Sequence, residues 1–181
     1  MAKTPRRGNP SAPDYPIDGR KAAEAVQQII GQLLSAELFF PTTRQVAQAV
    51  NGHPLTHAAI VYCGTNRQRL RAAIQRYFRF FGPVEGCRLV GADLDAGACI
   101  LDLVWTTPGG TVLVDELVAN RSVLPGMAAF EERVDEVFEA SRALFGDRLR
   151  GVRVCVFGAP AKSAFIEADG TESPLSHAVL P

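Results

Sequence analysis

The apolar residues in the first half of this chain recur at the spacing of helices. Between Asp18 and Tyr62 they predict three helices, separated by Pro41 and by the turn Asn51-Gly52-His53-Pro54. A further helix is predicted to begin at an N-cap formed by Thr65 or Asn66 and to end at Gly82. Its apolar stripe consists of Leu70, Ile74, Tyr77, Phe78 and Phe81.

The second half of the chain contains the apolar runs of strands. Runs at 87–92, 98–106 and 111–118 predict three strands. A helix is predicted to begin after Pro125-Gly126 and to end near Gly146. The valine-rich run at 152–157 predicts a buried strand, and Phe165-Ile166 can begin an edge strand. After residue 65 the predicted order is therefore helix, three strands, helix and strand, which indicates the α/β class.

Acidic residues interrupt two of the predicted strands. A three-residue loop at Pro108-Gly109-Gly110 places Thr107 opposite Thr111. Counting outward in that register, Asp102 lies directly opposite Glu116, on the same face of the sheet. Two opposed carboxylates repel each other unless a cation or a proton lies between them. The hairpin therefore predicts a site for a divalent metal.

Two alternatives to a metal site remain at this point. The acids can face solvent if one side of an antiparallel sheet is wet. A slip of one residue in the register would pair Asp102 with Asp115 or with Leu117. In the predicted register, Leu103 and Trp105 belong to the core face opposite Asp102.

Charge is distributed unequally along a chain whose net charge is zero. Residues 1–82 contain eleven Lys and Arg and four Asp and Glu, whereas residues 83–181 contain eight and fifteen. This asymmetry suggests that the first part binds a polyanion, although the two halves can also pair with each other. The candidate phosphate contacts lie on the outer side and flank of one predicted helix: Arg69, Arg71, Arg76 and Arg79. A solvated helix face is the alternative.

The composition indicates a globular protein with no membrane span. No apolar run approaches the roughly 18 residues that a spanning helix needs. Residues 1–16 are basic and rich in proline but lack the apolar region of a secretory signal, which favours a disordered tail and a cytoplasmic location. The four cysteines match neither a zinc site nor a disulfide framework. We expect a helical region at 17–64, an α/β core at 65–170 and a loose tail at 171–181.

The segment 66–157, with acids on its second and third strands, resembles the core of the PD-(D/E)XK nuclease superfamily. The resemblance implies a restriction-endonuclease-like αβββαβ core, a mixed sheet flanked by helices, preceded here by a small helical region. Asp102 in Leu-Asp-Leu-Val-Trp is similar to the family's first acid, and Glu116 in Val-Asp-Glu-Leu-Val to its second. These acids bind Mg²⁺ in the family, so the resemblance implies Mg²⁺ (or Mn²⁺) as the cofactor and metal-dependent cleavage of phosphodiester bonds.

This chain lacks the lysine of the family motif, because Val118 stands two residues after Glu116. A neighbouring cation stabilises the charge of the transition state, so another cation would have to replace the lysine. Arg121 and Lys162 are the candidates; an arginine is a poor proton acceptor but can stabilise charge.

The sequence thus supports two hypotheses about function. The first is a nucleic-acid-binding protein, with DNA as the expected partner, in which Asp102 and Glu116 hold Mg²⁺ for phosphodiester hydrolysis. The second is a catalytically inactive relative that acts as a binding or assembly module through a protein partner or a second copy of the chain. The missing lysine favours the second hypothesis, and the retained pair of acids favours the first.

Overall fold

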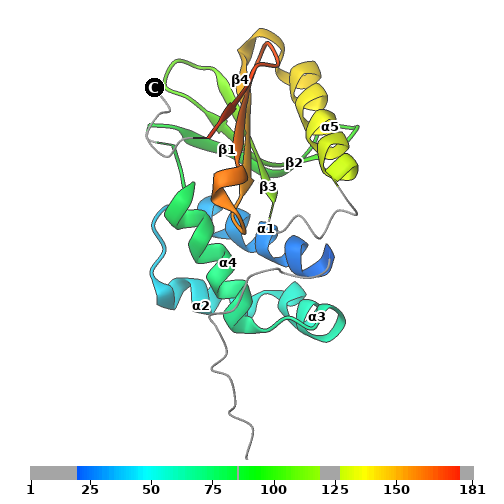
Figure 1. The fold of residues 1–181 in the computed structure, drawn as a ribbon. Helices are drawn as coiled ribbons and strands as arrows, with labels where there is room; N and C mark the ends of the chain where they lie inside the picture. Colours follow the sequence, from blue (N-terminus) through cyan, green and yellow to red (C-terminus); the bar gives the residue numbers. More distant parts are fainter. Residues whose placement is uncertain (1–19, 85, 119–126, 176–181) are drawn as a thin grey trace, which may run out of the picture.

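A six-stranded mixed β-sheet forms the centre of the protein, in a computed structural model that describes residues 20–84, 86–118 and 127–175 (Figure 1). The strands lie side by side in the order in which they occur along the chain. They are β1 (Arg88–Asp95), β2 (Ile100–Thr106), β3 (Val112–Val118), β4 (Leu149–Val156), β5 (Ala164–Glu167) and β6 (Glu172–Pro174). The predicted α/β class, with a mixed sheet flanked by helices, is confirmed.

The helices begin and end close to the predicted positions. In the described residues they are α1 (Arg20–Ser35), α2 (Thr43–Gly52), α3 (Pro54–Cys63), α4 (Arg67–Phe80) and α5 (Met127–Phe145), with short 3₁₀ turns η2 (Gly146–Arg148) and η3 (Pro160–Lys162). Thr42 and Gln45 form a capping box at the start of α2. Asn66 accepts the backbone N–H of Arg69 at the start of α4.

The connection between β3 and β4 determines the topology of the sheet. Strands β1, β2 and β3 form an antiparallel meander, whereas β3 and β4 are parallel and are joined through α5. The order α4-β1-β2-β3-α5-β4 is the predicted one. The prediction of a loose segment at 171–181 is wrong at Glu172–Pro174, which pairs with β5 as β6. This three-residue edge strand contains a proline and shows no apolar alternation, so no sequence signal indicates it.

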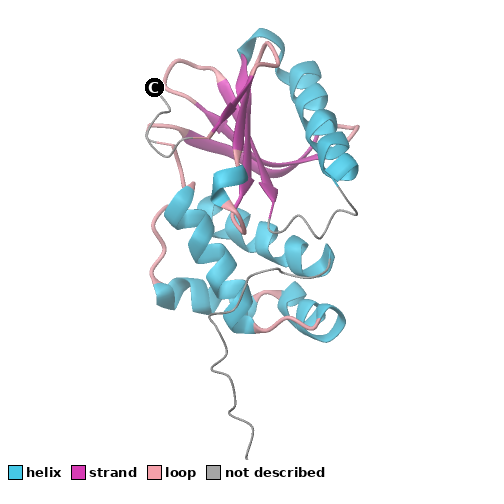
Figure 2. Ribbon diagram, viewed as in Figure 1, coloured by secondary structure: helices cyan, strands magenta, loops and turns pink. Residues whose placement is uncertain are grey.

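Helices lie on both sides of the sheet (Figure 2). The core consists of two apolar clusters, one that includes side chains of α1 and α4 and one that includes side chains of α5. Leu103 and Trp105 belong to the cluster that includes side chains of α1 and α4. Val104 and Val114 belong to the cluster that includes side chains of α5. The prediction that Leu103 and Trp105 are core residues is confirmed.

The N-terminal helices share their core with the sheet. Apolar side chains of α1 pack in the same cluster as those of β2, β3 and β4. Gly31 of α1 approaches β1 so closely that a Cβ atom added to it would lie 2.9 Å from the Cβ of Ala92. The predicted helical region 17–64 and the predicted α/β core 65–170 therefore share one hydrophobic core. The N-terminal helices cover a face of the sheet that would otherwise be exposed to water.

Candidate functional site: a closed pair of acids

The β2–β3 hairpin has the register predicted from its turn. Leu103 pairs with Asp115, so the same register continued by one position sets Asp102 opposite Glu116. Both acids are buried, with exposed fractions of 7% and 4%. The alternative of a solvent-facing pair is therefore wrong. The chain folds in this way because the hairpin contributes its apolar residues to both faces of the sheet, and the two acids are covered with them.

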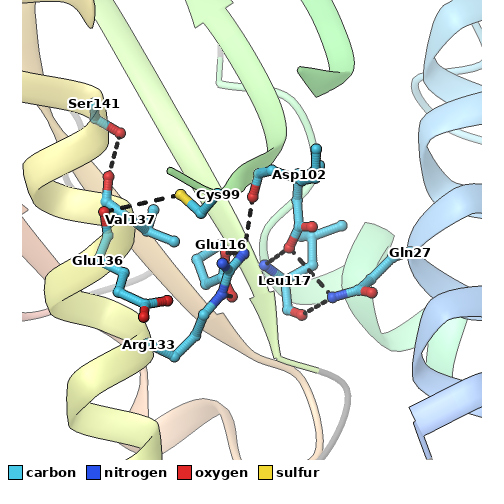
Figure 3. A network of polar contacts seen from close by, with 10 residues as sticks. Gln27, Cys99, Asp102, Glu116, Leu117, Arg133, Glu136, Val137 and Ser141 are labelled. Carbon is cyan, nitrogen blue, oxygen red and sulfur yellow. Dashed lines mark hydrogen bonds and ion pairs between the residues drawn. The ribbon is translucent and has the colours of Figure 1, made fainter. Parts of the chain in front are cut away.

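Asp102 is held by β3 and by α1 (Figure 3). Its Oδ2 atom accepts a hydrogen bond from the backbone N–H of Leu117 at 2.6 Å and one from Nε2 of Gln27 at 3.3 Å. The same Nε2 atom of Gln27 donates to the carbonyl of Leu117 at 2.8 Å. The pairing of β2 with β3 ends at Leu103 and Asp115. The backbone N–H of Leu117 lies beyond this last pair, and the carboxylate of Asp102 satisfies it.

Glu116 is paired with an arginine from the opposite helix, α5 (Figure 3). Nε of Arg133 lies 2.9 Å from Oε1 of Glu116, and its Nη2 atom lies 3.2 Å from Oε2. The same Nη2 donates to the carbonyl of Ile100, at the start of β2, at 2.8 Å. The side chain of Arg133 is 25% exposed and that of Glu116 is 6% exposed. This bidentate, partly buried contact is of the strong, orientation-specific kind.

Burial and mutual repulsion favour a proton on Asp102. Burial first, and then the charge of Glu116, raise the pKa of Asp102 well above its ordinary value. Burial also raises the pKa of Glu116, but Arg133 and a hydrogen bond with Asp102 oppose that shift. The proton therefore resides preferentially on Asp102, while Glu116 keeps its charge beside Arg133. A proton and a guanidinium group thus relieve the repulsion that suggested a metal.

The acids, as arranged, do not fit a divalent cation. Both oxygens of Glu116 are bonded to Arg133, and Oδ2 of Asp102 already accepts two hydrogen bonds. A cation placed at Glu116 would also meet the positive charge of the guanidinium group. Among the described residues, no group of three or more His, Cys, Asp or Glu side chains could hold a metal ion.

A second buried acid lies on the other face of β3. Asp115 is bonded through both carboxylate oxygens to Arg153 of β4, its direct partner in the parallel register. Its Oδ2 atom also accepts Nε1–H of Trp105 at 3.0 Å and the hydroxyl of Tyr77 at 3.5 Å. Arg153 makes a further bond to the carbonyl of Gly82. Asp115 is fully buried, so this cluster fixes α4 and β4 to β3 and offers no access to a ligand.

The structure does not bring the predicted replacement cations to the acids. Arg121 lies outside the described residues. Lys162 lies in η3, with an exposed side chain, and no described contact joins it to Asp102 or Glu116. The position expected for their charge is taken by Arg133 of α5.

The four arginines of α4 predicted to contact phosphate do not form one solvated face. The side chain of Arg71 donates to Oδ1 of Asn51 at 3.0 Å, and Nη1 of Arg76 lies 3.5 Å from the carbonyls of Phe157 and Gly158. Arg69 is half-buried, and Arg79 is exposed. Arg71 and Arg76 therefore make contacts within the protein, whereas Arg69 and Arg79 are more open to a ligand.

The arginine-bearing helix α4 contacts the segment that follows β4, beside the end of β3. Arg76 contacts the carbonyl of Phe157, directly after β4, and the N–H of Phe157 donates to the carbonyl of Val118 at the end of β3. Glu116 lies two residues before Val118, and η3 with Lys162 follows β4. In open α/β sheets, ligands bind outside the carboxyl ends of the strands, which is where these groups gather.

Sequence reasoning missed both arginines that pair with the buried acids. Arg153 alternates with valine and cysteine in a buried strand, and a charge in that position requires a partner of opposite sign. Arg133 is the basic residue within an acidic stretch of α5, at a position that no local rule connects to β3. The first signal could have been recognised; the second requires the crossover geometry of α5.

A search of protein-family models, of curated proteins and of solved structures found no match to this chain. Within the described residues, no helix has both the length and the apolar character needed to cross a membrane.

Proposed function

We propose that this protein binds nucleic acid through phosphate contacts at the carboxyl ends of β3 and β4, on a restriction-endonuclease-like core whose acid pair is closed by Arg133. The order α4-β1-β2-β3-α5-β4, with one acid on β2 and one on β3, supports the fold assignment. The contact of α4 with the segment between β4 and η3, beside the carboxyl end of β3, carries the proposal.

The charge of α4 supports a polyanionic ligand. The helix contains five arginines and no acidic residue within its 14 positions. Arg79 is exposed and Arg69 is half-exposed, so both can reach a phosphate group without breaking a described hydrogen bond. Guanidinium groups bind phosphate oxygens in a bidentate manner, which makes such a helix suited to a sugar–phosphate backbone.

The closed acid pair favours binding without hydrolysis. A metal-dependent nuclease needs carboxylate oxygens available to the cation, and both oxygens of Glu116 are occupied by Arg133. The same arginine neutralises the acid, so the pair does not repel a phosphate as two free carboxylates would. Arg133 thus makes the site compatible with a bound polyanion.

Magnesium-dependent phosphodiester hydrolysis is the second candidate function. It is favoured by the charges at the site, where two buried carboxyl groups lie near one arginine. Burial raises the pKa of both Asp102 and Glu116. If Arg133 leaves Glu116, carboxylate oxygens of the type that Mg²⁺ prefers become available.

Binding of a labelled duplex of about 20 base pairs, followed by fluorescence anisotropy at low and high salt, tests the proposal. We expect an affinity that falls as salt rises, and a salt slope smaller by about 0.9 for each phosphate contact removed by Arg69→Gln or Arg79→Gln. Arg142→Gln, at an exposed position on α5, is the matched control and should leave the slope unchanged. Absence of binding at low salt would refute the proposal and direct the search to a protein partner.

A further inference from the structure

The stretch from Leu38 to Val84 contains six arginines and no aspartate or glutamate. It forms the connection from α1 to α2 and the helices α2, α3 and α4. These elements therefore contribute positive charge and no negative side chain to the surface of the protein, which suits them to a polyanion. Arg44, in the first turn of α2, is one of the exposed arginines.

An exposed aromatic ring lies beside this positive charge. The connection from α1 to α2 runs beside α4 (Figure 1), and Nε2 of Gln75 lies 3.4 Å from Oγ1 of Thr43. Leu38 and Phe39 pack against the core cluster of α1 and α4, whereas the next residue, Phe40, is 85% exposed. Because Phe40 precedes Thr43 by three residues, its ring stands where α2 begins, next to α4. A ligand that covers the ring would remove a large apolar surface from water.

The end of α4 combines a second aromatic ring with a cation. The guanidinium group of Arg79 lies over the ring of Phe80, with Cζ 5.4 Å from the ring centroid. Arg79 is exposed and Phe80 is half-buried. Gln75 lies four residues before Arg79 and therefore on the same face of α4. Arg79 thus faces the side of α4 on which the connection from α1 to α2 runs.

We propose that the surface formed by Phe40, Arg44, Gln75, Arg79 and Phe80 binds single-stranded nucleic acid, with bases stacked on the two rings and phosphates held by the arginines. This inference rests on the proposed function and specifies the form of its ligand. A single strand leaves its base faces open to aromatic side chains, whereas a duplex stacks its bases internally and presents its phosphates. Duplex binding therefore uses the arginines without the rings and is weaker.

Three labelled probes, followed by fluorescence anisotropy with the full chain, test the inference. They are a strand of about 20 thymidines, a duplex of about 20 base pairs and a strand of the same length that lacks bases. We expect the thymidine strand to bind most tightly. Phe40→Ala should weaken its binding by about five- to a hundredfold and leave the salt slope unchanged, because stacking involves no counterion release. Binding of the duplex and of the base-free strand should not change.

Phe80→Leu provides a second variant, which keeps an apolar side chain at a half-buried position, and should weaken binding of the thymidine strand in the same way. Leu144→Ala removes an exposed apolar side chain from α5 and is the control that should bind as wild type does. Circular dichroism establishes that each variant is folded. Equal affinity of wild type for the three probes, or wild-type affinity of both phenylalanine variants for the thymidine strand, would overturn the inference and leave the phosphate-binding proposal in place. Absence of binding to all three probes would overturn both.

Discussion

The replacement Asp102→Asn should make the protein more stable at neutral pH. Asparagine is close in shape to the protonated form of aspartic acid, and its carbonyl oxygen can accept the N–H of Leu117 and the amide of Gln27 as Oδ2 of Asp102 does. Its amide can donate toward Glu116, as the protonated carboxyl group does. The substitution therefore keeps the contacts and removes a group that burial makes costly to ionise.

The sign of the pH dependence follows from the raised pKa of Asp102. The unfolded chain releases the proton near pH 4, whereas the folded protein keeps it to higher pH. Between these two values the carboxyl group of Asp102 binds more protons in the folded state, so its contribution to the free energy of unfolding falls as pH rises. The fall is about 1.4 kcal/mol for each pH unit between them, and each kcal/mol moves Tm by about 2 to 4 °C in a chain of this size.

Urea denaturation from about pH 4 to pH 8 measures this effect. We expect Asp102→Asn and wild type to be nearly equal at the acid end, and the variant to be progressively more stable above it. Asp135→Asn, an exposed site on α5, is the control and should change stability by less than about 0.5 kcal/mol. A pH profile of Asp102→Asn parallel to that of wild type, or a variant less stable at pH 7, would refute the reasoning.

Three further predictions concern the framework of the site and can be checked by urea denaturation. Arg153→Met should lower the free energy of unfolding by about 3 to 5 kcal/mol, because it leaves Asp115 buried without its partner. Adding Asp115→Leu should restore part of that loss, and a double variant no more stable than Arg153→Met would contradict this prediction. Gly151→Ala should lower the free energy of unfolding by about 1 to 3 kcal/mol, since the added Cβ would overlap the carbonyl oxygen of Ile166. Unchanged stability would show that β5 moves freely. Thr42→Ala should lower the free energy of unfolding by about 1 kcal/mol through loss of the capping box, and a neutral result would mean that the cap adds nothing to α2.

The register of the hairpin could be predicted because its local signals agree. The loop Pro108-Gly109-Gly110 suits a three-residue connection, and the backbone of Gly110 has the positive φ of 80° that such a turn requires. The turn fixes the pairing, and the pairing places Asp102 opposite Glu116. Local spacing was sufficient here since each residue of the turn constrains the next.

The partners of the acids could not be predicted in the same way. Arg133 reaches Glu116 only because α5 crosses back over the sheet between β3 and β4, and Gln27 reaches Asp102 only because α1 packs on the opposite side. These contacts join residues separated by 17 and 75 positions. Spacing within one element carries no information about them, so the sequence predicted a cation beside the acids but not that Arg133 of α5 supplies it.

The most direct test of the proposed function is a single titration in which the labelled DNA duplex is followed for binding and for strand integrity in the presence of Mg²⁺. The account predicts salt-dependent binding with the strands intact, because Arg133 keeps Glu116 occupied. Absence of binding at low salt would contradict the assignment of α4 as a phosphate-binding helix. Cleavage that Asp102→Asn abolishes would show that the acid pair is an active metal centre, not a closed one.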